Sequence, residues 1–253
     1  MSDPAIELRG LVRIGEDRDE LYDELGHALM VVGIEANESR GVFHLALSGG
    51  STPEPFYMRL VTDPRFRSIP WKTTHVWIVD ERRVPEDDEK SNFRMIRETL
   101  VDHVPIPQRF VHAMSVLEDD PVEAYEGQLK QHIEDLRLDF VVLGMGDDGH
   151  TASLFPGSPA LKVHDRYITV NQGPAVTPPD RVTMTYPLLN SARQLAILVT
   201  GTEKAATLRR VADLLSQNRS DPDTLPITGI HPIDDDDSLI WYLDREAVGT
   251  ASD

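Results

Sequence analysis

Cysteine is absent from this sequence of 253 residues, which excludes disulfide bonds, thiolate catalysis and zinc sites that use cysteine ligands. Long hydrophobic runs are absent as well, because no apolar stretch approaches the length that crosses a membrane. The opening residues MSDPAIELRG lack the pattern of a signal peptide. We therefore expect a cytoplasmic protein that has no membrane partner.

Basic residues are scarce, since 25 Lys and Arg stand against 43 Asp and Glu, for a formal net charge of −18. Nucleic-acid binding needs a basic surface, so this composition argues against broad nucleic-acid binding. A local group of Lys, Arg and backbone N–H groups can still bind an anionic small molecule. Hydrophobic residues make up 40% of the chain, enough for a substantial core, and we expect one domain over residues 1–253.

Strands alternate with amphipathic helices along the chain. Strands are expected at 42–47, 75–79, 140–143, 195–199 and 239–243, with others near 6–14, 110–113, 167–170 and 181–185, and helices over 17–37, 53–61, 92–101, 121–136 and 202–215. This alternation predicts an α/β fold with a mainly parallel, doubly wound, Rossmann-like sheet and helices on both faces. In such sheets ligands bind beyond the carboxyl ends of the strands, and three of these ends are unusually polar.

The first polar strand end, Ser48-Gly49-Gly50-Ser51-Thr52, has the composition of a phosphate site. Its two glycines let the backbone approach a ligand, and its hydroxyls and the N–H groups of the next helix are donors. We expect Thr52 to cap that helix, with Pro53 at the first helical position. The alternative is an ordinary strand-to-helix turn. No G-K-[ST] follows, so the loop is not a P-loop.

The strand end at 144–151 matches the dinucleotide pattern G-x-G-x-x-G over Gly144 to Gly149. A dinucleotide loop runs directly into a helix, but Pro156 interrupts this one, and Asp147 and Asp148 would repel a pyrophosphate. We therefore interpret the match as a coincidence. A histidine on a tight glycine loop, two residues after a carboxylate, suits a positioned base, and His150 is our candidate. The alternative is a histidine that merely caps the loop.

Taken together, the polar strand ends resemble the 6-phosphogluconolactonase family. The resemblance rests on Leu47-Ser48-Gly49-Gly50-Ser51-Thr52-Pro53, on Asp80-Glu81-Arg82 with Ser91-Asn92, on the run from Gly144 to Gly157, on Pro179 to Thr185, and on Gly201-Thr202-Glu203-Lys204. It implies a fold related to sugar-phosphate isomerases and glucosamine-6-phosphate deaminases. It also implies hydrolysis of 6-phospho-D-glucono-1,5-lactone to 6-phosphogluconate in the oxidative pentose phosphate pathway, with no metal and no organic cofactor.

The lactone is an activated ester, so its hydrolysis needs a water molecule to be deprotonated and placed. A neutral imidazole can do this near pH 7, and we expect His150 to be the general base. Asp148 is expected to orient His150 or to stabilise its imidazolium, with the adjacent Asp147 as the alternative carboxylate. The developing oxyanion needs fixed donors, and both the loop N–H groups and Arg82 are candidates.

The 6-phosphate is expected on the loop from Ser48 to Thr52, with Lys204 as a point charge beside it. Arg181 and Asn92 are further expected substrate or phosphate contacts. Two alternatives to the lactonase are a glucosamine-6-phosphate deaminase and a non-catalytic sugar-phosphate-binding protein. The deaminase family carries a glutamate five positions after the histidine, where this chain has Phe155, and this difference counts against deamination.

Overall fold

The computed structural model describes residues 6–249, whose strands form two separate sheets. The larger sheet has seven strands in the order β1-β10-β9-β6-β2-β3-β5, and all of its neighbouring strands are parallel. Its strands are β1 (Leu11–Gly15), β2 (Phe43–Leu47), β3 (Thr74–Ile78), β5 (Val111–His112), β6 (Phe140–Gly144), β9 (Leu195–Val199) and β10 (Leu239–Asp244). The predicted α/β class with a mainly parallel sheet is confirmed.

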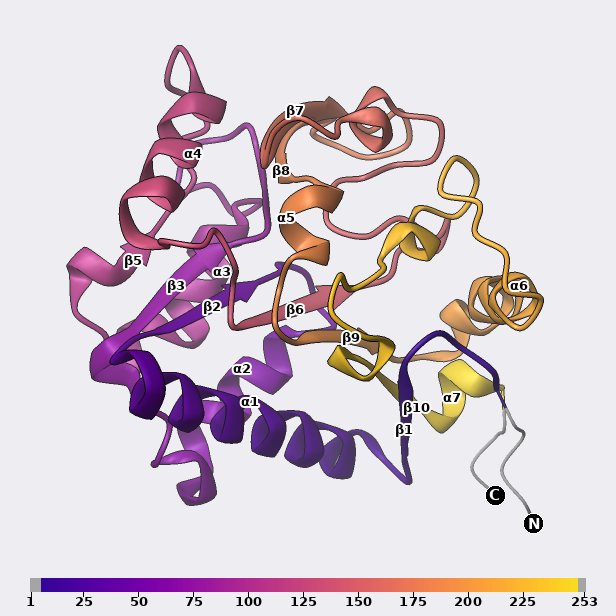
Figure 1. The fold of residues 1–253 in the computed structure, drawn as a ribbon, viewed down its shortest axis with the longest axis horizontal. Coiled ribbons are helices and arrows are strands. Elements are labelled where there is room, and N and C mark those ends of the chain that lie inside the picture. Colours follow the sequence, from indigo (N-terminus) through magenta and orange to yellow (C-terminus); the bar gives the residue numbers. More distant parts are fainter. Residues whose placement is uncertain (1–5, 250–253) are drawn as a thin grey trace.

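Helices flank the larger sheet. They are α1 (Arg18–Arg40), α2 (Glu54–Thr62), α3 (Asn92–Thr99), α4 (Pro121–His132), α5 (Tyr186–Asn190), α6 (Ala205–Leu215) and α7 (Arg245–Val248). In Figure 1, α1 and α2 lie below β2, β6 and β9, whereas α4 and α5 lie above these strands. Strands β2, β3 and β9 are buried along their whole length, which explains why all three are rich in apolar residues.

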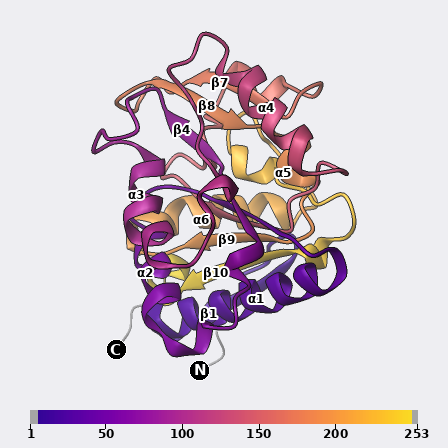
Figure 2. The ribbon, with the colours of Figure 1, turned by 90° about the vertical axis from the view of Figure 1, so that its left-hand side faces the viewer.

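The smaller sheet is antiparallel and consists of β4 (Asp80–Arg82), β8 (Asp180–Met184) and β7 (Ile168–Gln172). Figure 2 shows it at the end of the molecule opposite α1. Only Val79 separates β3 from β4, so the chain passes directly from the larger sheet into the smaller one. The site at the carboxyl edge of the larger sheet therefore has the smaller sheet beside it.

One predicted cap is wrong. Helix α2 begins at Glu54, and Pro53 is its N-cap, with helical φ and ψ of −81° and −16° and no capping hydrogen bond from a side chain. Residues 51–53 form a turn before the helix, so Thr52 lies too early in the chain to cap it. Its side chain instead lines the cavity described below.

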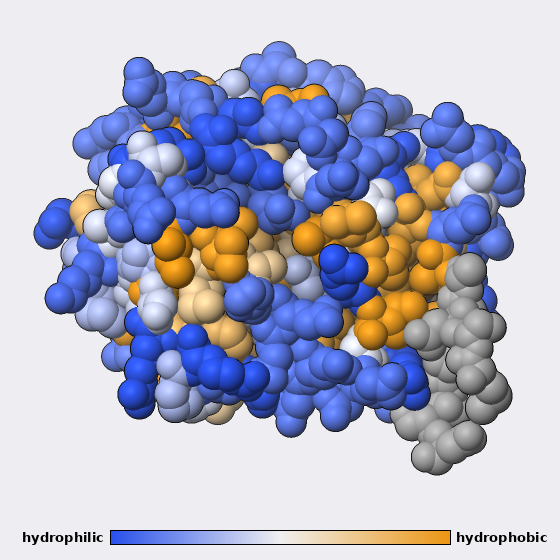
Figure 3. Space-filling view, turned by 60° about the horizontal axis from the view of Figure 1, so that its bottom comes forward, coloured by the Kyte–Doolittle hydropathy of each residue, from blue (hydrophilic) through white to orange (hydrophobic). Residues whose placement is uncertain are grey.

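Hydrophilic residues cover most of the face shown in Figure 3, with smaller apolar areas between them. Over residues 6–249, the exposed large hydrophobic side chains are Val31, Met58, Leu117, Val170 and Ile233. Most hydrophobic residues are instead buried in the core, around the strands of the larger sheet.

A cluster of four histidines lies beside Trp77, and it consists of His44, His75, His112 and His132. The first three of them are buried. The Nδ1 atom of His75 lies 2.9 Å from Nε2 of His112, and the ring centres of His112 and His132 are 4.8 Å apart. Trp77 donates a hydrogen bond of 3.2 Å to His44. Burial is the main cause that lowers the pKa of His44 to about 4, of His75 to about 3 and of His112 to about 4.

This cluster predicts acid lability. The histidines titrate near pH 6.5 in the unfolded chain. Between pH 6.5 and about 3 the unfolded state therefore binds more protons than the folded state, and the free energy of unfolding decreases as the pH is lowered. Replacing His112 with glutamine should make this fall shallower, by at most about 1.4 kcal/mol per pH unit. Urea unfolding at several pH values between 7 and 4.5 measures the slope. The exposed His164 is the control; equal slopes for His112→Gln and His164→Gln would contradict the prediction.

Candidate active site

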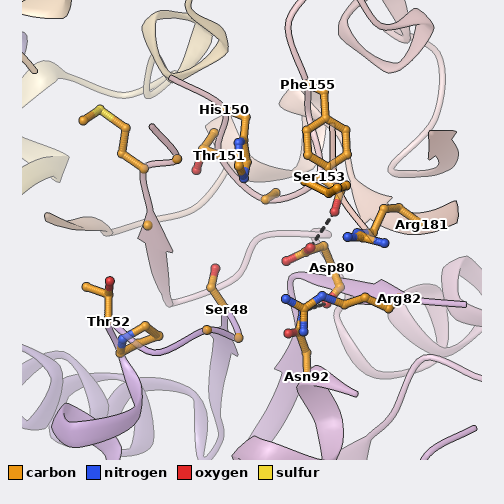
Figure 4. A pocket seen from close by; sticks show the side chains of 18 of the residues that line it. Ser48, Thr52, Asp80, Arg82, Asn92, His150, Thr151, Ser153, Phe155 and Arg181 are labelled. Carbon is orange, nitrogen blue, oxygen red and sulfur yellow. Dashed lines mark hydrogen bonds between the residues drawn. The ribbon is translucent and has the colours of Figure 1, made fainter. Parts of the chain in front are cut away.

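A cavity of about 450 Å³ opens at the carboxyl edge of the larger sheet (Figure 4). The segments that follow β2, β3, β6 and β9 all contribute to its wall, because parallel strands end at the same edge. Ten of the predicted site residues line it: Ser48, Gly49, Gly50, Ser51, Thr52, Arg82, Asn92, His150, Arg181 and Lys204. Asp148, the remaining predicted residue, is outside this lining and contacts His150.

The loop after β6 holds His150 in a fixed orientation. Its Nδ1 lies 2.5 Å from Oδ1 of Asp148, and its backbone N–H donates to the same oxygen at 3.1 Å. Burial raises the pKa of Asp148 and the hydrogen bond from His150 lowers it, with a net result below the usual value, so the carboxylate is ionised at neutral pH. Because Nδ1 is occupied, Nε2 is the ring nitrogen available to a substrate.

Gly146 allows this pair to form. A Cβ at this position would lie 2.1 Å from Nδ1 of His150 and 2.9 Å from Oδ1 of Asp148. Gly146 also donates to the carbonyl of His150 at 2.8 Å, which closes the loop. The chain after Gly149 continues through turns to a 3₁₀ helix at Pro159–Lys162 and forms no α-helix there. The glycines therefore bring a histidine and a carboxylate together, and the arrangement differs from a dinucleotide loop.

Phe155 is packed against the catalytic candidate. Its ring centre is 4.9 Å from that of His150, and the guanidinium of Arg181 lies 6.0 Å from the same ring. The phenyl group is buried and also lines the cavity. An apolar ring therefore occupies the position at which the deaminase family carries a carboxylate.

The loop after β2 forms the opposite wall, where Figure 4 shows Ser48 and Thr52. A Cβ on Gly49 would lie 1.8 Å from Oδ1 of Asn92, so only glycine allows this contact. Gly50 has a φ of +108°, which favours glycine. Within residues 6–249, only four buried side-chain polar atoms have no hydrogen-bond partner, and three of them belong to residues of this cavity: Ser48 Oγ, Asn92 Oδ1 and Thr151 Oγ1.

Lys204 reaches the cavity from the segment after β9. Its Nζ lies 2.5 Å from Oδ1 of Asp147, and only 15% of its side chain is exposed. The two adjacent aspartates thus have different partners, because Asp147 pairs with Lys204 and Asp148 with His150. Sequence reasoning did not separate their roles.

The smaller sheet contributes two arginines. Arg82 on β4 and Arg181 on β8 are paired in register, and Figure 4 shows both beside Asp80. Arg181 is buried and donates to the carbonyls of Pro178 and Asp180. Burial lowers the pKa of Arg181, but the guanidinium stays charged because the ordinary pKa of arginine is very high.

Sequence reasoning assigned no role to Asp80 and Ser153, which also line the cavity. Ser153 Oγ donates a 2.6 Å hydrogen bond to Asp80 Oδ2 and so joins the segment after β6 to the start of β4. Both residues belong to the stretches that carry the family resemblance, and this is the sequence signal that could have identified them as site residues. Over the part of the chain that the structure describes, His, Asp and Glu residues form no group suited to hold a metal, and no helix has the length and apolarity to span a membrane.

The sequence model of a family described as glucosamine-6-phosphate isomerases/6-phosphogluconolactonase matches residues 16–241. The 6-phosphogluconolactonase of Synechocystis sp. is 38% identical, over 84% of this chain and 86% of that protein. The GDH/6PGL endoplasmic bifunctional protein of Homo sapiens is 36% identical over 90% of this chain. The chain spans only 29% of that bifunctional protein, and the same share of its rabbit counterpart.

Solved structures agree with this likeness. The 6-phosphogluconolactonase of Thermotoga maritima superposes with a TM-score of 0.78 at 27% identity, covering 93% of this chain and 100% of that chain. The 6-phosphogluconolactonase of Trypanosoma brucei gives a TM-score of 0.78 at 25% identity, covering 97% and 100%. The likeness therefore extends over nearly the whole of the chain.

Proposed function

The chain belongs to the family of glucosamine-6-phosphate isomerases and 6-phosphogluconolactonases, and on this premise we propose that it hydrolyses 6-phospho-D-glucono-1,5-lactone to 6-phosphogluconate. This reaction is a step of the oxidative pentose phosphate pathway. The observation that carries the proposal is the 2.5 Å contact between His150 and Asp148 at the cavity wall. Phe155, in the place of the deaminase glutamate, favours the lactonase over the deaminase.

In the proposed mechanism, Nε2 of His150 takes a proton from water as the water oxygen attacks C1 of the lactone. The bond from C1 to the ring oxygen then breaks, and the imidazolium returns the proton to that oxygen, which becomes the 5-hydroxyl of the product. The ionised Asp148 stabilises the imidazolium between these two steps. Arg82 is our candidate to stabilise the oxyanion, because its Nη1 is anchored by the carbonyl of Lys90 at 2.8 Å.

The 6-phosphate in this proposal lies against the loop from Ser48 to Thr52 and the ammonium of Lys204. Hydroxyls and backbone N–H groups of the loop donate to its oxygens, and Gly49 and Gly50 allow the close approach. Arg181 adds a second fixed positive charge at the cavity. Asn92 donates its amide to the carbonyl of Asp80 at 2.7 Å, which leaves an acceptor oxygen and so favours a substrate hydroxyl over the phosphate.

Replacing Lys204 with alanine should weaken binding of 6-phosphogluconate by about 1.5–3 kcal/mol, the usual scale of a hydrogen bond to a charged group. Calorimetry measures the affinity. Hydrolysis of unphosphorylated gluconolactone should hardly change. The variant also leaves Asp147 unpaired near the phosphate, so the double variant Lys204→Ala/Asp147→Asn separates the lost attraction from the added repulsion. An equal loss of activity with the phosphorylated and the unphosphorylated lactone would show that Lys204 does not bind the phosphate.

The activity itself is tested with freshly made lactone. The product is oxidised by 6-phosphogluconate dehydrogenase, and NADPH formation is followed after subtraction of the spontaneous hydrolysis. A purified protein that gives no rate above this background is not a lactonase. If it still binds 6-phosphogluconate, it would instead be a sugar-phosphate-binding protein.

We further propose that residues 1–253 act as one domain, in the cytoplasm. The cavity is lined by residues from Ser48 to Lys204, so segments far apart in the sequence share one site, which supports a single domain. Relatives in rice are named chloroplastic and mammalian ones endoplasmic, so compartments differ within the family. Cell fractionation tests the location.

A further inference from the structure

Glu81 has a position unlike that of its two neighbours on β4. Asp80 and Arg82 both line the cavity, whereas Glu81 does not. Successive side chains of a strand point to opposite faces, which places Glu81 on the side away from the substrate. The residue is nevertheless almost completely buried, with 2% of its surface exposed.

The carboxylate of Glu81 accepts four hydrogen bonds. Oε1 accepts from the backbone N–H of Arg82 at 2.7 Å and from that of Asn92 at 2.8 Å. Oε2 accepts from the backbone N–H of Phe93 at 2.7 Å and from Oγ of Ser91 at 3.0 Å. Both oxygens are thus used as acceptors, which only the ionised form allows in full.

Three of these donors lie at the start of α3. Ser91 is the N-cap of this helix and accepts from the backbone N–H of Arg94 at 3.0 Å, so its hydroxyl connects the helix to Glu81. A helix N-terminus has unpaired N–H groups and favours a negative charge. Burial raises the pKa of Glu81, and the four donors act in the opposite direction. The carboxylate therefore ties the first turn of α3 to β4.

Asn92 extends this connection to the phosphate-binding candidate loop. Its backbone is held by Glu81, its side-chain amide donates to the carbonyl of Asp80, and its Oδ1 is packed against Gly49. A displacement of the first turn of α3 would therefore move Asn92 at the cavity wall. It would also release the backbone of Arg82 from its hydrogen bond to Oε1.

We propose that Glu81 is a positioning residue for the reaction proposed above: it does not touch the substrate, but it fixes Arg82 and Asn92 in the cavity by joining β4 to α3. The inference rests on the proposed lactonase function. A 1 Å misplacement of groups in an active site can lower a rate about 10²-fold, so the effect is measurable.

The test is the isosteric variant Glu81→Gln. The NH₂ group of the glutamine replaces one acceptor oxygen and faces hydrogen-bond donors. The connection between β4 and α3 is therefore weakened, although the side chain keeps its volume. We expect kcat/KM for the lactone to fall about 10- to 100-fold, with a clear decrease of kcat.

Glu126 provides a matched control. It is also a buried carboxylate, and it accepts from the backbone N–H groups of Tyr167 and Ile168 at 2.7 and 3.0 Å, but it does not line the cavity. Glu126→Gln should lower the urea midpoint to a similar extent while kcat/KM stays within twofold of wild type. Activities are compared at a temperature at which circular dichroism shows all proteins folded.

A Glu81→Gln protein with kcat/KM within twofold of wild type would overturn the proposal, as would equal losses of activity in the two glutamine variants. If Glu81→Gln does not fold, Ser91→Ala is used, since it removes one donor to Glu81; a loss of about 3- to 10-fold is then expected, and wild-type activity would overturn the proposal.

An inactive wild-type protein would count against the lactonase function and not against Glu81. The affinity for 6-phosphogluconate then decides: Glu81→Gln should weaken it and Glu126→Gln should not, and equal affinities would overturn the positioning role.

Discussion

Replacing His150 with alanine should lower kcat for the lactone by about 10²–10⁴-fold, the usual contribution of a general base. The affinity for 6-phosphogluconate should stay close to that of wild type, because the phosphate contacts come from other segments. Steady-state kinetics across the pH range and calorimetry with the product measure both effects.

Two further proteins make this result specific. His150→Asn keeps a polar group near the position of Nδ1 but lacks Nε2, and it should be as inactive as the alanine variant, whereas the exposed His164→Ala should be fully active. A fully active His150→Ala enzyme would refute the assignment of the base. Calorimetry with NAD and NADP at millimolar concentration should show no binding; saturable binding that Gly146→Val abolishes would restore the dinucleotide interpretation of this loop.

The second large effect is expected from a single methyl group. Gly146→Ala places a Cβ 2.1 Å from Nδ1 of His150, so the imidazole must move away from Asp148. A displacement of about 1 Å can cost about 10²-fold in rate, and we expect kcat to fall by at least that factor. Product affinity should change little, since the loop after β2 and Lys204 are unaltered.

Gly127→Ala is the matched control for this variant. Gly127 lies within α4, and a Cβ there meets no atom within 4 Å. The substitution should leave kcat unchanged and stabilise the helix by up to about 1 kcal/mol, because alanine is a better helix former than glycine. Wild-type activity in Gly146→Ala would show that the loop can accommodate a side chain and that its glycine is not required for the base.

The strands that were predicted well are those whose signal is local. β2, β6 and β9 are apolar runs because a parallel sheet is covered on both faces, and this pattern is visible in a short window. β4 has no such signal, since Asp80, Glu81 and Arg82 are all polar. It is a strand because it pairs with β8 about 100 residues later, with Asp80 opposite Thr183. Tertiary pairing decides its conformation, and no local pattern contains that information.

The same distinction applies to the site. His150 and two aspartates lie in one loop, so the pairing of the histidine with a neighbouring carboxylate could be predicted from the spacing and the glycines around them. The contacts of Ser153 with Asp80 and of Lys204 with Asp147 join residues 73 and 57 positions apart, and they depend on which strands become neighbours. The identity of the aspartate that faces the histidine also required the structure, because two adjacent aspartates follow Gly146.

The cavity lies where the chain leaves the larger sheet for the smaller one, with His150 and Ser48 on the first side and Arg82 and Arg181 on the second. A sugar phosphate that contacts both sides would bind the assembled protein and not the unfolded chain. At a free concentration 100 times its dissociation constant, such a ligand adds about 2.7 kcal/mol to the free energy of unfolding. Under the proposed function this ligand is 6-phosphogluconate, so the protein should resist proteolysis better in its presence than in its absence.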